Sequence, residues 1–442
     1  MISIKEINKL AIPAILFNIT EPLIGLADTA LIGQMDYQAT LAQGGVGLSS
    51  GLIATLVWGL AQMRTSLSAI VSRHFGSDHL EKIKSLIPQT FLMTLLLGSI
   101  IGGLLIYYFN EVAIFLFGDI EEHTFNFAKD YFKIRALGLP ISLLIALFFG
   151  VFRGFQNTSW AMYISIIGGV VNIFLDVILI NGYEDILNPM GVEGAAWASL
   201  TTQVVMVLLC IIFYLSKTPF GLALSPKINP YFKEMITIFL NMFIRTLVLN
   251  IVFIMANRYA NHYGEEELAA YTIGYNIWIF TSFFIDGYSN AGNALAGKFL
   301  GEKNSNKLQY LGKKLMWINI RISFILMIIY TISYAYIGSI FNSDESVLNH
   351  FNHTFWIIII AQPFNSIAFT FDGIFKGMGR AVELRNTLIQ ATFLIFIPTL
   401  FFLNLIHENL LSIWISLSLW MVYRGGSLLY KFKTKPITAP LS

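Results

Sequence analysis

Four acidic side chains stand inside long apolar stretches of this sequence. They are Glu21, Asp28, Asp176 and Asp286. On scales that measure insertion into a bilayer, one charged side chain at the centre of a helix costs roughly 2.5–3.5 kcal/mol. Each of the four therefore needs a partner, water, a bound cation or a proton. This makes them the first candidates for chemistry.

Asp176 shares a helical face with an amide and a small residue. Gly168, Asn172 and Asp176 recur at i, i+4 and i+8, which places them on one face of a helix. At ~1.5 Å per residue, Asp28 and Asp176 lie at similar depths of ~25–29 Å. Two carboxylates and an amide oxygen suit a hard cation, or the two carboxyl groups share a proton. A hydrogen bond from each Asp to a neighbouring helix is the alternative.

A second set of charges lies near the middle of the apolar segments. Counting from the segment ends places Glu21 level with Arg64, and Arg245 level with Asp286. The sequence therefore predicts two intramembrane ion pairs, Glu21–Arg64 and Arg245–Asp286, because each partner lowers the burial cost of the other. We expect them to have a structural or gating role.

Three further polar residues lie within or at the ends of apolar segments. Asp372 is four residues from Lys376, so its side chain could reach the membrane surface as an interfacial charge. Asn250 and Asn257 are seven residues apart on one helical face and could line a cavity. Pro13 and Pro22 interrupt the backbone hydrogen bonds of the first segment, which would allow it to bend.

The composition is that of a polytopic membrane protein. Of 442 residues, 56% are hydrophobic and 12% are charged, whereas soluble domains carry about 25% charged residues. The single cysteine, Cys210, excludes a disulfide framework and a thiolate metal site. The basic residues are scattered and the net charge is +2, so nothing indicates a nucleic-acid partner.

Twelve segments are long enough to span a bilayer, which requires roughly 20 residues each. A polar connector at 217–230 divides the chain into an N-terminal lobe, 1–216, and a C-terminal lobe, 231–442. The sequence thus predicts an all-α fold of twelve transmembrane helices. Their predicted ranges are 7–34, 43–72, 85–108, 127–151, 159–181, 191–215, 231–260, 266–297, 312–338, 350–375, 384–404 and 409–430.

The loops alternate in charge along the chain. The loops on the side of the termini are rich in Lys and Arg, and the opposite loops are acidic. By the positive-inside rule both termini face the cytoplasm, and we expect the protein in a bacterial inner membrane.

The two halves of the sequence repeat one another. Gly150–Gly154 reads GVFRG and Gly373–Gly377 reads GIFKG, while Lys5-Glu6 corresponds to Lys233-Glu234. Each half holds an even number of spans, so the two repeats have the same orientation. They should be related by a pseudo-two-fold axis along the membrane normal, with a transport path between them.

Several motifs resemble the multidrug and toxic compound extrusion (MATE) family, and within it the DinF-like branch. They are PLIGLADTALIG at 22–33, RGFQ at 153–156, NIFLD at 172–176 and DGIF at 372–375. The resemblance implies a rocker-switch antiporter that exports organic, often cationic, compounds in exchange for H⁺ or Na⁺. One departure is QNTSWA at 156–161, where the family usually has QDTKTP. It changes the loop that joins the fourth and fifth spans on the cytoplasmic side.

The resemblance also assigns roles to residues. It implies a coupling-ion site at Asp28, Asn172 and Asp176, completed by a hydroxyl of the sixth span, Ser199 or Thr201. It adds a substrate or coupling role as an alternative for Asp372. No cofactor is expected beyond the coupling ion, and the protein is expected to be a monomer in the bilayer.

The aromatic content, with 37 Phe, 19 Tyr and 8 Trp, suits flat, lipophilic, cationic substrates through cation–π contacts. A related flippase of a lipid-linked saccharide would share the fold and the repeat. It should hold a basic central cavity for pyrophosphate, whereas the mid-membrane charges here are balanced. An enzyme is disfavoured because every His lies in a loop or at a span end and no HExxH motif occurs. A channel is disfavoured because no repeated filter loop occurs.

Overall fold

The computed structural model describes all residues except 1, 36–37, 119, 184–186 and 436–442, and it leaves the side chain of Glu21 undescribed. Helices dominate the described residues. The first half of the chain forms α1 (Ile4–Ile32), α2 (Ala39–Leu60), α3 (Met63–Gly76), η1 (Leu80–Ile83), α4 (Leu86–Tyr107), α5 (Phe109–Phe117), α6 (Glu122–Leu137), α7 (Leu139–Gly154), α8 (Ser159–Asn181) and α9 (Gly191–Lys217).

The second half follows after an extended connector. It forms α10 (Phe232–Tyr263), α11 (Glu265–Gly301), α12 (Ser305–Ile332), η2 (Gly338–Ile340), α13 (Glu345–Gly377), α14 (Ala381–Gln390), the π-helix η3 (Ala391–Phe396), α15 (Ile397–Ile406) and α16 (Leu410–Thr434).

The described helices include twelve segments long enough to span a membrane. Among the described residues, ten helical segments are long and apolar enough to span a membrane, counting α2–α3 and α14–α15 as one each. The pair α6–α7, bent by 48°, adds an eleventh, and the 25-residue α16, which is less apolar, is the twelfth segment of this length. The predicted all-α fold of twelve helices is confirmed. α1 is assigned as one helix through both Pro13 and Pro22, so its bending stays a prediction.

Polar side chains define where several helices begin. Ser3 and Glu6 form a capping box at the start of α1, and the Asp344 side chain accepts the N–H groups of Ser346 and Val347 at the start of α13. At α6, Glu121 accepts the Thr124 N–H at 2.9 Å. This hydrogen bond lowers the pKa of Glu121.

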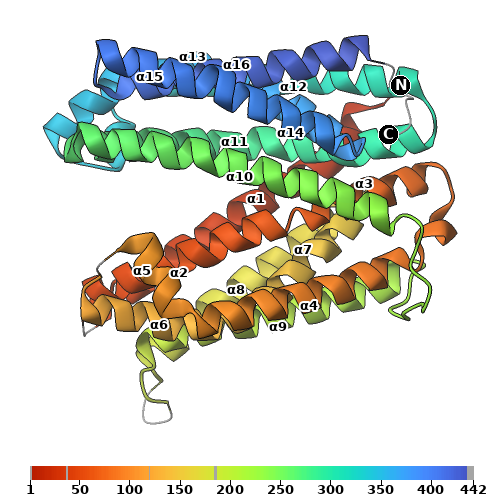
Figure 1. The fold of residues 1–442 in the computed structure, drawn as a ribbon, viewed down its shortest axis with the longest axis horizontal. Coiled ribbons are helices and arrows are strands. Elements are labelled where there is room, and N and C mark those ends of the chain that lie inside the picture. Colours follow the sequence, from red (N-terminus) through yellow and green to blue (C-terminus); the bar gives the residue numbers. More distant parts are fainter. Residues whose placement is uncertain (1, 36–37, 119, 184–186, 436–442) are drawn as a thin grey trace.

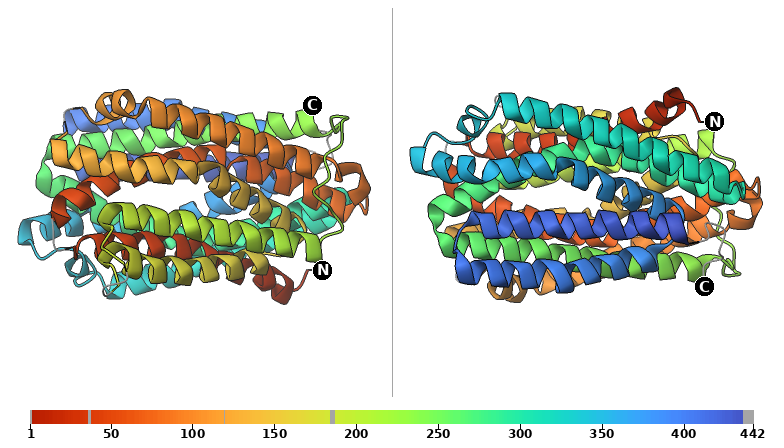
Figure 2. Two further views of the ribbon diagram at one scale, coloured as in Figure 1. Left: turned by 90° about the horizontal axis from the view of Figure 1, so that it is seen from below. Right: turned by 90° about the horizontal axis from the view of Figure 1, so that it is seen from above.

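The helices form two bundles, which we call the N-terminal lobe (α1–α9) and the C-terminal lobe (α10–α16). Figure 1 shows both chain termini at the same end of the molecule, which we call the terminal face. The two lobes meet at this face and spread apart toward the other end (Figure 1). Figure 2 shows the long helices of both lobes running in nearly the same direction.

The contact between the lobes depends on small residues of α3 and α11. A Cβ at Gly76 would lie 1.9 Å from the Lys298 carbonyl oxygen, and one at Gly297 would lie 1.8 Å from the Ser72 hydroxyl. Larger residues at these two positions would push the lobes apart. Farther from the terminal face, Asn18 of α1 donates to the Phe283 carbonyl at 3.5 Å.

A bidentate ion pair closes the terminal face. Arg73 of α3 donates to both carboxylate oxygens of Glu234 of α10, at 2.8 and 2.7 Å. Each side chain is about one-fifth exposed, and a fork-to-fork pair adds geometric specificity. The pair therefore favours the arrangement in which the lobes touch at this face.

We expect Glu234→Gln to open the terminal face. A partly exposed pair is worth up to about 1 kcal/mol, so the closed population should fall about fivefold relative to the open one. Spin labels on cysteines introduced at the exposed positions Asp78 and Asn306 would measure the distance between the lobes at the terminal face. The native Cys210 is buried, so it should not take up a label. Exchanging the two charges, Arg73→Glu with Glu234→Arg, should restore the closed distance. An unchanged distance in Glu234→Gln would contradict this role.

Candidate functional site

The N-terminal lobe brings together the three residues predicted to bind the coupling ion. Asp28 lies on α1, and Asn172 and Asp176 lie on α8. These two helices pack against each other, since a Cβ at Gly169 of α8 would lie 3.2 Å from Ile24 of α1. Asp176 is 0% exposed and Asn172 is 2% exposed.

Buried polar atoms of this site lack hydrogen-bond partners among the described residues. They are Oδ1 of Asp28, both carboxylate oxygens of Asp176 and Nδ2 of Asn172. The Asp28 and Asp176 carboxyl groups are close enough to influence each other, and a hydrogen bond between them would require that one carry a proton. Buried polar groups are normally paired, and a proton, a hard cation or water would supply the missing partners of these oxygens.

On the sixth span, one of the two expected hydroxyl residues is exposed, and a neighbouring threonine is buried. Thr201 is exposed on α9, whereas the next residue, Thr202, is 5% exposed and unpartnered among the described residues. Ser199 is also buried. One residue turns a helix by about 100°, and the sequence pattern did not define which face of α9 is buried. Thr202 is therefore a further buried hydroxyl to consider, and whether Ser199 or Thr201 completes the ion site stays a prediction.

Arg135 of α6 is a component that sequence reasoning missed. It is close enough to attract both Asp28 and Asp176 electrostatically. With the Gln203 side-chain amide oriented so that its nitrogen donates to the Gly138 carbonyl, Arg135 Nη1 donates to the Gln203 amide oxygen at 2.8 Å. The Nε of Arg135 is buried without a partner among the described residues. The sequence offered one indication of Arg135: it is the last basic residue before the apolar half of the fourth span.

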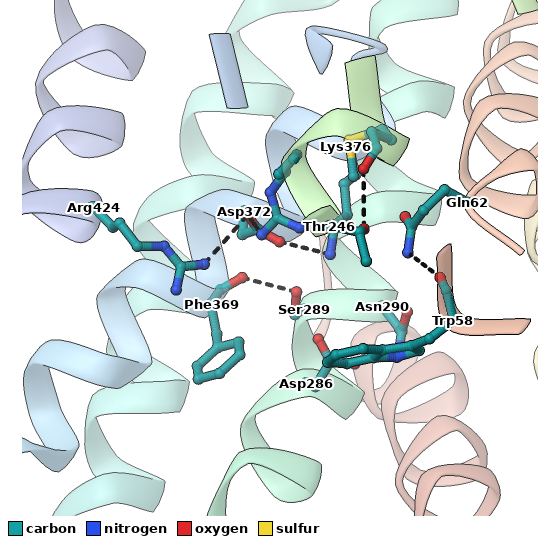
Figure 3. A network of polar contacts seen from close by, with 12 residues as sticks. Trp58, Gln62, Thr246, Asp286, Ser289, Asn290, Phe369, Asp372, Lys376 and Arg424 are labelled. Atoms are coloured by element: carbon teal, nitrogen blue, oxygen red, sulfur yellow. Dashed lines mark hydrogen bonds and ion pairs between the residues drawn. The ribbon is translucent and has the colours of Figure 1, made fainter. Parts of the chain in front are cut away.

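In the C-terminal lobe, Arg245 has a different partner from the one predicted. Arg245 of α10 donates to Asp372 of α13 at 2.5 Å, so the predicted Arg245–Asp286 pair is wrong. Depth counting placed Arg245 and Asp286 at the same level, but it does not show which helix face each occupies. Asp286 instead accepts a hydrogen bond from Asn290 at 3.2 Å. The two lie away from Asp372 in Figure 3.

Asp372 is the centre of a buried charge cluster. It is 3% exposed, which contradicts its interpretation as an interfacial charge. Besides Arg245, it contacts Lys376 Nζ at 2.6 Å and Arg424 Nη2 at 3.9 Å. Figure 3 shows Arg424 and Lys376 on two sides of Asp372.

The remaining candidates are not assembled into a site by described contacts. Arg64 is half-buried, but the side chain of Glu21 lies outside the described part, so the Glu21–Arg64 pair stays a prediction. Asn250 is half-buried and Asn257 is exposed, and whether they line a cavity also stays a prediction. No group of three or more His, Cys, Asp or Glu side chains among the described residues could hold a metal ion.

The fold and these sites define a class of protein: a polytopic α-helical membrane protein with two six-helix repeats and buried carboxylates at membrane depth. The MatE family matches residues 13–178 and 238–402, one stretch in each repeat. The chain belongs to the MatE family.

Two relatives cover almost the whole chain. The DNA damage-inducible protein F of Escherichia coli is 25% identical over 430 residues, covering 96% of this chain and 91% of that protein. The probable multidrug resistance protein NorM of Thermotoga maritima is 25% identical, covering 95% and 90%. Among solved structures, an outward-facing multidrug resistance MATE transporter matches with a TM-score of 0.86 at 19% identity, over 96% of this chain and 94% of that one.

Proposed function

We propose that this protein is a secondary active antiporter that exports organic, cationic and lipophilic compounds in exchange for H⁺ or Na⁺. The observation that carries the proposal is the pair of buried carboxyl groups, Asp28 and Asp176, whose oxygens lack partners among the described residues. Family membership and the names of relatives, including the multidrug export protein MepA of Staphylococcus aureus, support an export function.

The exchange follows from the charge of the site. Two carboxylates attract a cation, and a bound proton or Na⁺ neutralises part of their charge. A cationic substrate then loses part of its attraction to the N-terminal lobe and is released. By linkage, the two ligands must weaken each other's binding for exchange to occur.

The lobe arrangement supports a rocker-switch cycle. The lobes touch through α3 and α11 at the terminal face, which the basic loops predict to be cytoplasmic. In that orientation the present arrangement is open to the outside of a bacterial inner membrane. Rocking the lobes about the contact near Asn18 and Phe283 would expose the site to the inside.

Transport into proteoliposomes tests this proposal and identifies the ion. Ethidium, a flat lipophilic cation, is offered under an imposed pH gradient and separately under a Na⁺ gradient at matched ionic strength. We expect one of the gradients to drive ethidium against its own gradient. Folded protein that moves no dye under either gradient would overturn the proposal and favour a flippase.

The positive charge of Arg135 is expected to weaken the binding of the coupling cation at this site. We expect Arg135→Gln to tighten binding of the coupling cation roughly tenfold, because an opposite charge close to a carboxylate favours its ionised, cation-free form. The measurement is the proton or Na⁺ concentration that gives half-maximal protection of the protein against thermal unfolding. Lys133→Gln, an exposed change on the same helix, is the control. A weaker or unchanged cation affinity in Arg135→Gln would contradict the role.

A further inference from the structure

The cluster around Asp372 contains more positive than negative charge. Arg245, Lys376 and Arg424 come from three helices, α10, α13 and α16, and all their ion pairs among the described residues end on this single carboxylate. The arrangement thus holds three cationic groups against one anionic group. Side-chain exposures of 8% for Arg245 and 5% for Arg424 leave little water to screen the excess. A buried charge without a counter-charge is unfavourable, so the cluster is short of an anion.

Asp372 already uses both of its oxygens. Oδ1 accepts from Arg245 at 2.5 Å, and Oδ2 contacts Lys376 Nζ at 2.6 Å. Arg424 is left with a distant contact to Oδ1, at 3.9 Å. One carboxylate cannot give three basic groups short contacts in this geometry.

Arg424 shows this shortage most clearly. Its Nη1 donates to the Met421 sulfur at 3.1 Å, and its guanidinium lies 4.4 Å from the centre of the Trp420 ring. A thioether is a weak acceptor, and a ring face attracts a cation less strongly than an anion does. Arg424 therefore retains donors suited to the fork of a carboxylate or phosphate.

One member of the cluster is partly exposed. Lys376 is its most exposed member, with 21% of its side chain exposed. Figure 3 shows Gln62 and Trp58 of the N-terminal lobe on the same side as Lys376. The other acidic residue in view, Asp286, accepts a hydrogen bond from Asn290.

We propose that Lys376, Arg424 and Arg245 form a binding site for an anionic group, a carboxylate or a phosphate, in the C-terminal lobe. The site lies in a different lobe from Asp28 and Asp176, so it does not depend on the proposed coupling site. The anion has two possible sources with the same chemistry. It is part of a transported compound, which would then carry both charges, or it is the phosphate of a lipid headgroup.

Thermal unfolding in detergent tests the site without any ion gradient. A thiol-reactive dye reports unfolding through Cys210, the single and fully buried cysteine. Inorganic phosphate and benzoate are the probes, each titrated against chloride at equal ionic strength and fixed pH. We expect at least one probe to raise the unfolding midpoint in a saturable way.

Two substitutions should shift this affinity in opposite directions. Arg424→Gln should weaken the probe's apparent affinity at least tenfold. Asp372→Asn, which removes the resident competitor, should tighten it. Arg385→Gln is the matched control, because Arg385 is in the same lobe, carries the same charge and hydrogen-bonds Asn241 instead of Asp372. It should leave the affinity unchanged.

Nanodiscs distinguish the two sources. If phosphatidylglycerol weakens probe binding relative to phosphatidylcholine in wild type but not in Arg424→Gln, the site takes a lipid phosphate. If probe binding in both lipids equals that in a maltoside detergent, which contains no phosphate, it takes a soluble anion. The proposal is overturned if neither probe stabilises the wild type, or if Arg424→Gln and Arg385→Gln respond to the probes alike. Lys376→Gln serves as the second variant should Arg424→Gln fail to fold.

Discussion

Asp176→Asn is expected to abolish cation-driven transport while the protein stays folded. Asp176 is fully buried and both of its oxygens lack partners among the described residues, so the change to an amide removes charge without breaking a described contact. Coupling free energies are typically 1–3 kcal/mol, and we expect the gradient-driven rate to fall on the order of a hundredfold. The measurement is ethidium movement in proteoliposomes under the gradient that drives the wild type.

The control is Asp130→Asn, on α6 of the same lobe. Asp130 is about half exposed and lies 3.5 Å from Lys133, and such surface pairs contribute little. This variant should transport at the wild-type rate. The coupling role is contradicted if Asp176→Asn, shown by its thermal profile to be folded, keeps wild-type coupled transport.

Asp372→Asn is expected to destabilise the C-terminal lobe more than any other single change at a charged residue discussed above. It leaves Arg245, Lys376 and Arg424 without their shared counter-charge. Removing one partner of a buried ion pair typically costs about 3–5 kcal/mol. The measurement is the midpoint of thermal unfolding, followed with the thiol-reactive dye on Cys210.

Glu383→Gln is a suitable comparison for this change. Glu383 also pairs with a basic group, Arg380, but close to the surface of the lobe. Its loss should lower the midpoint far less, since partly exposed pairs contribute up to about 1 kcal/mol. Adding Arg245→Met to Asp372→Asn should recover part of the stability because it removes one uncompensated cation. Equal effects of Asp372→Asn and Glu383→Gln would contradict the account of the cluster.

The sequence was sufficient for the fold because apolar length and loop charge are properties of single segments. The repeat between Gly150–Gly154 and Gly373–Gly377 was equally visible, and these glycines allow α7 and α13 to pack closely against α3 and α11. The association of Asp28 with Asp176 was predicted from their similar depth together with the family resemblance, because depth alone does not show which helices face each other.

Contacts between helices were harder to predict. Depth counting gave Arg245 the wrong partner, because it fixes height but not the rotation of each helix. The same limitation kept Thr202, which the structure buries, out of the predicted candidates. Arg135 was missed because its segment also contains exposed charges, such as Lys133, from which the sequence does not distinguish the half-buried Arg135. Pairing across helices requires the three-dimensional arrangement.

A coupling cation at Asp28 and Asp176 and an organic cation are expected to exclude one another. The most direct measurement is the affinity of ethidium for the detergent-solubilised protein at a series of pH values and Na⁺ concentrations, with choline keeping the ionic strength constant. We predict that the apparent Kd of ethidium rises as the coupling cation is added, and that Asp176→Asn removes this dependence. Ethidium that binds the wild type with the same affinity at every pH and Na⁺ concentration would contradict the account.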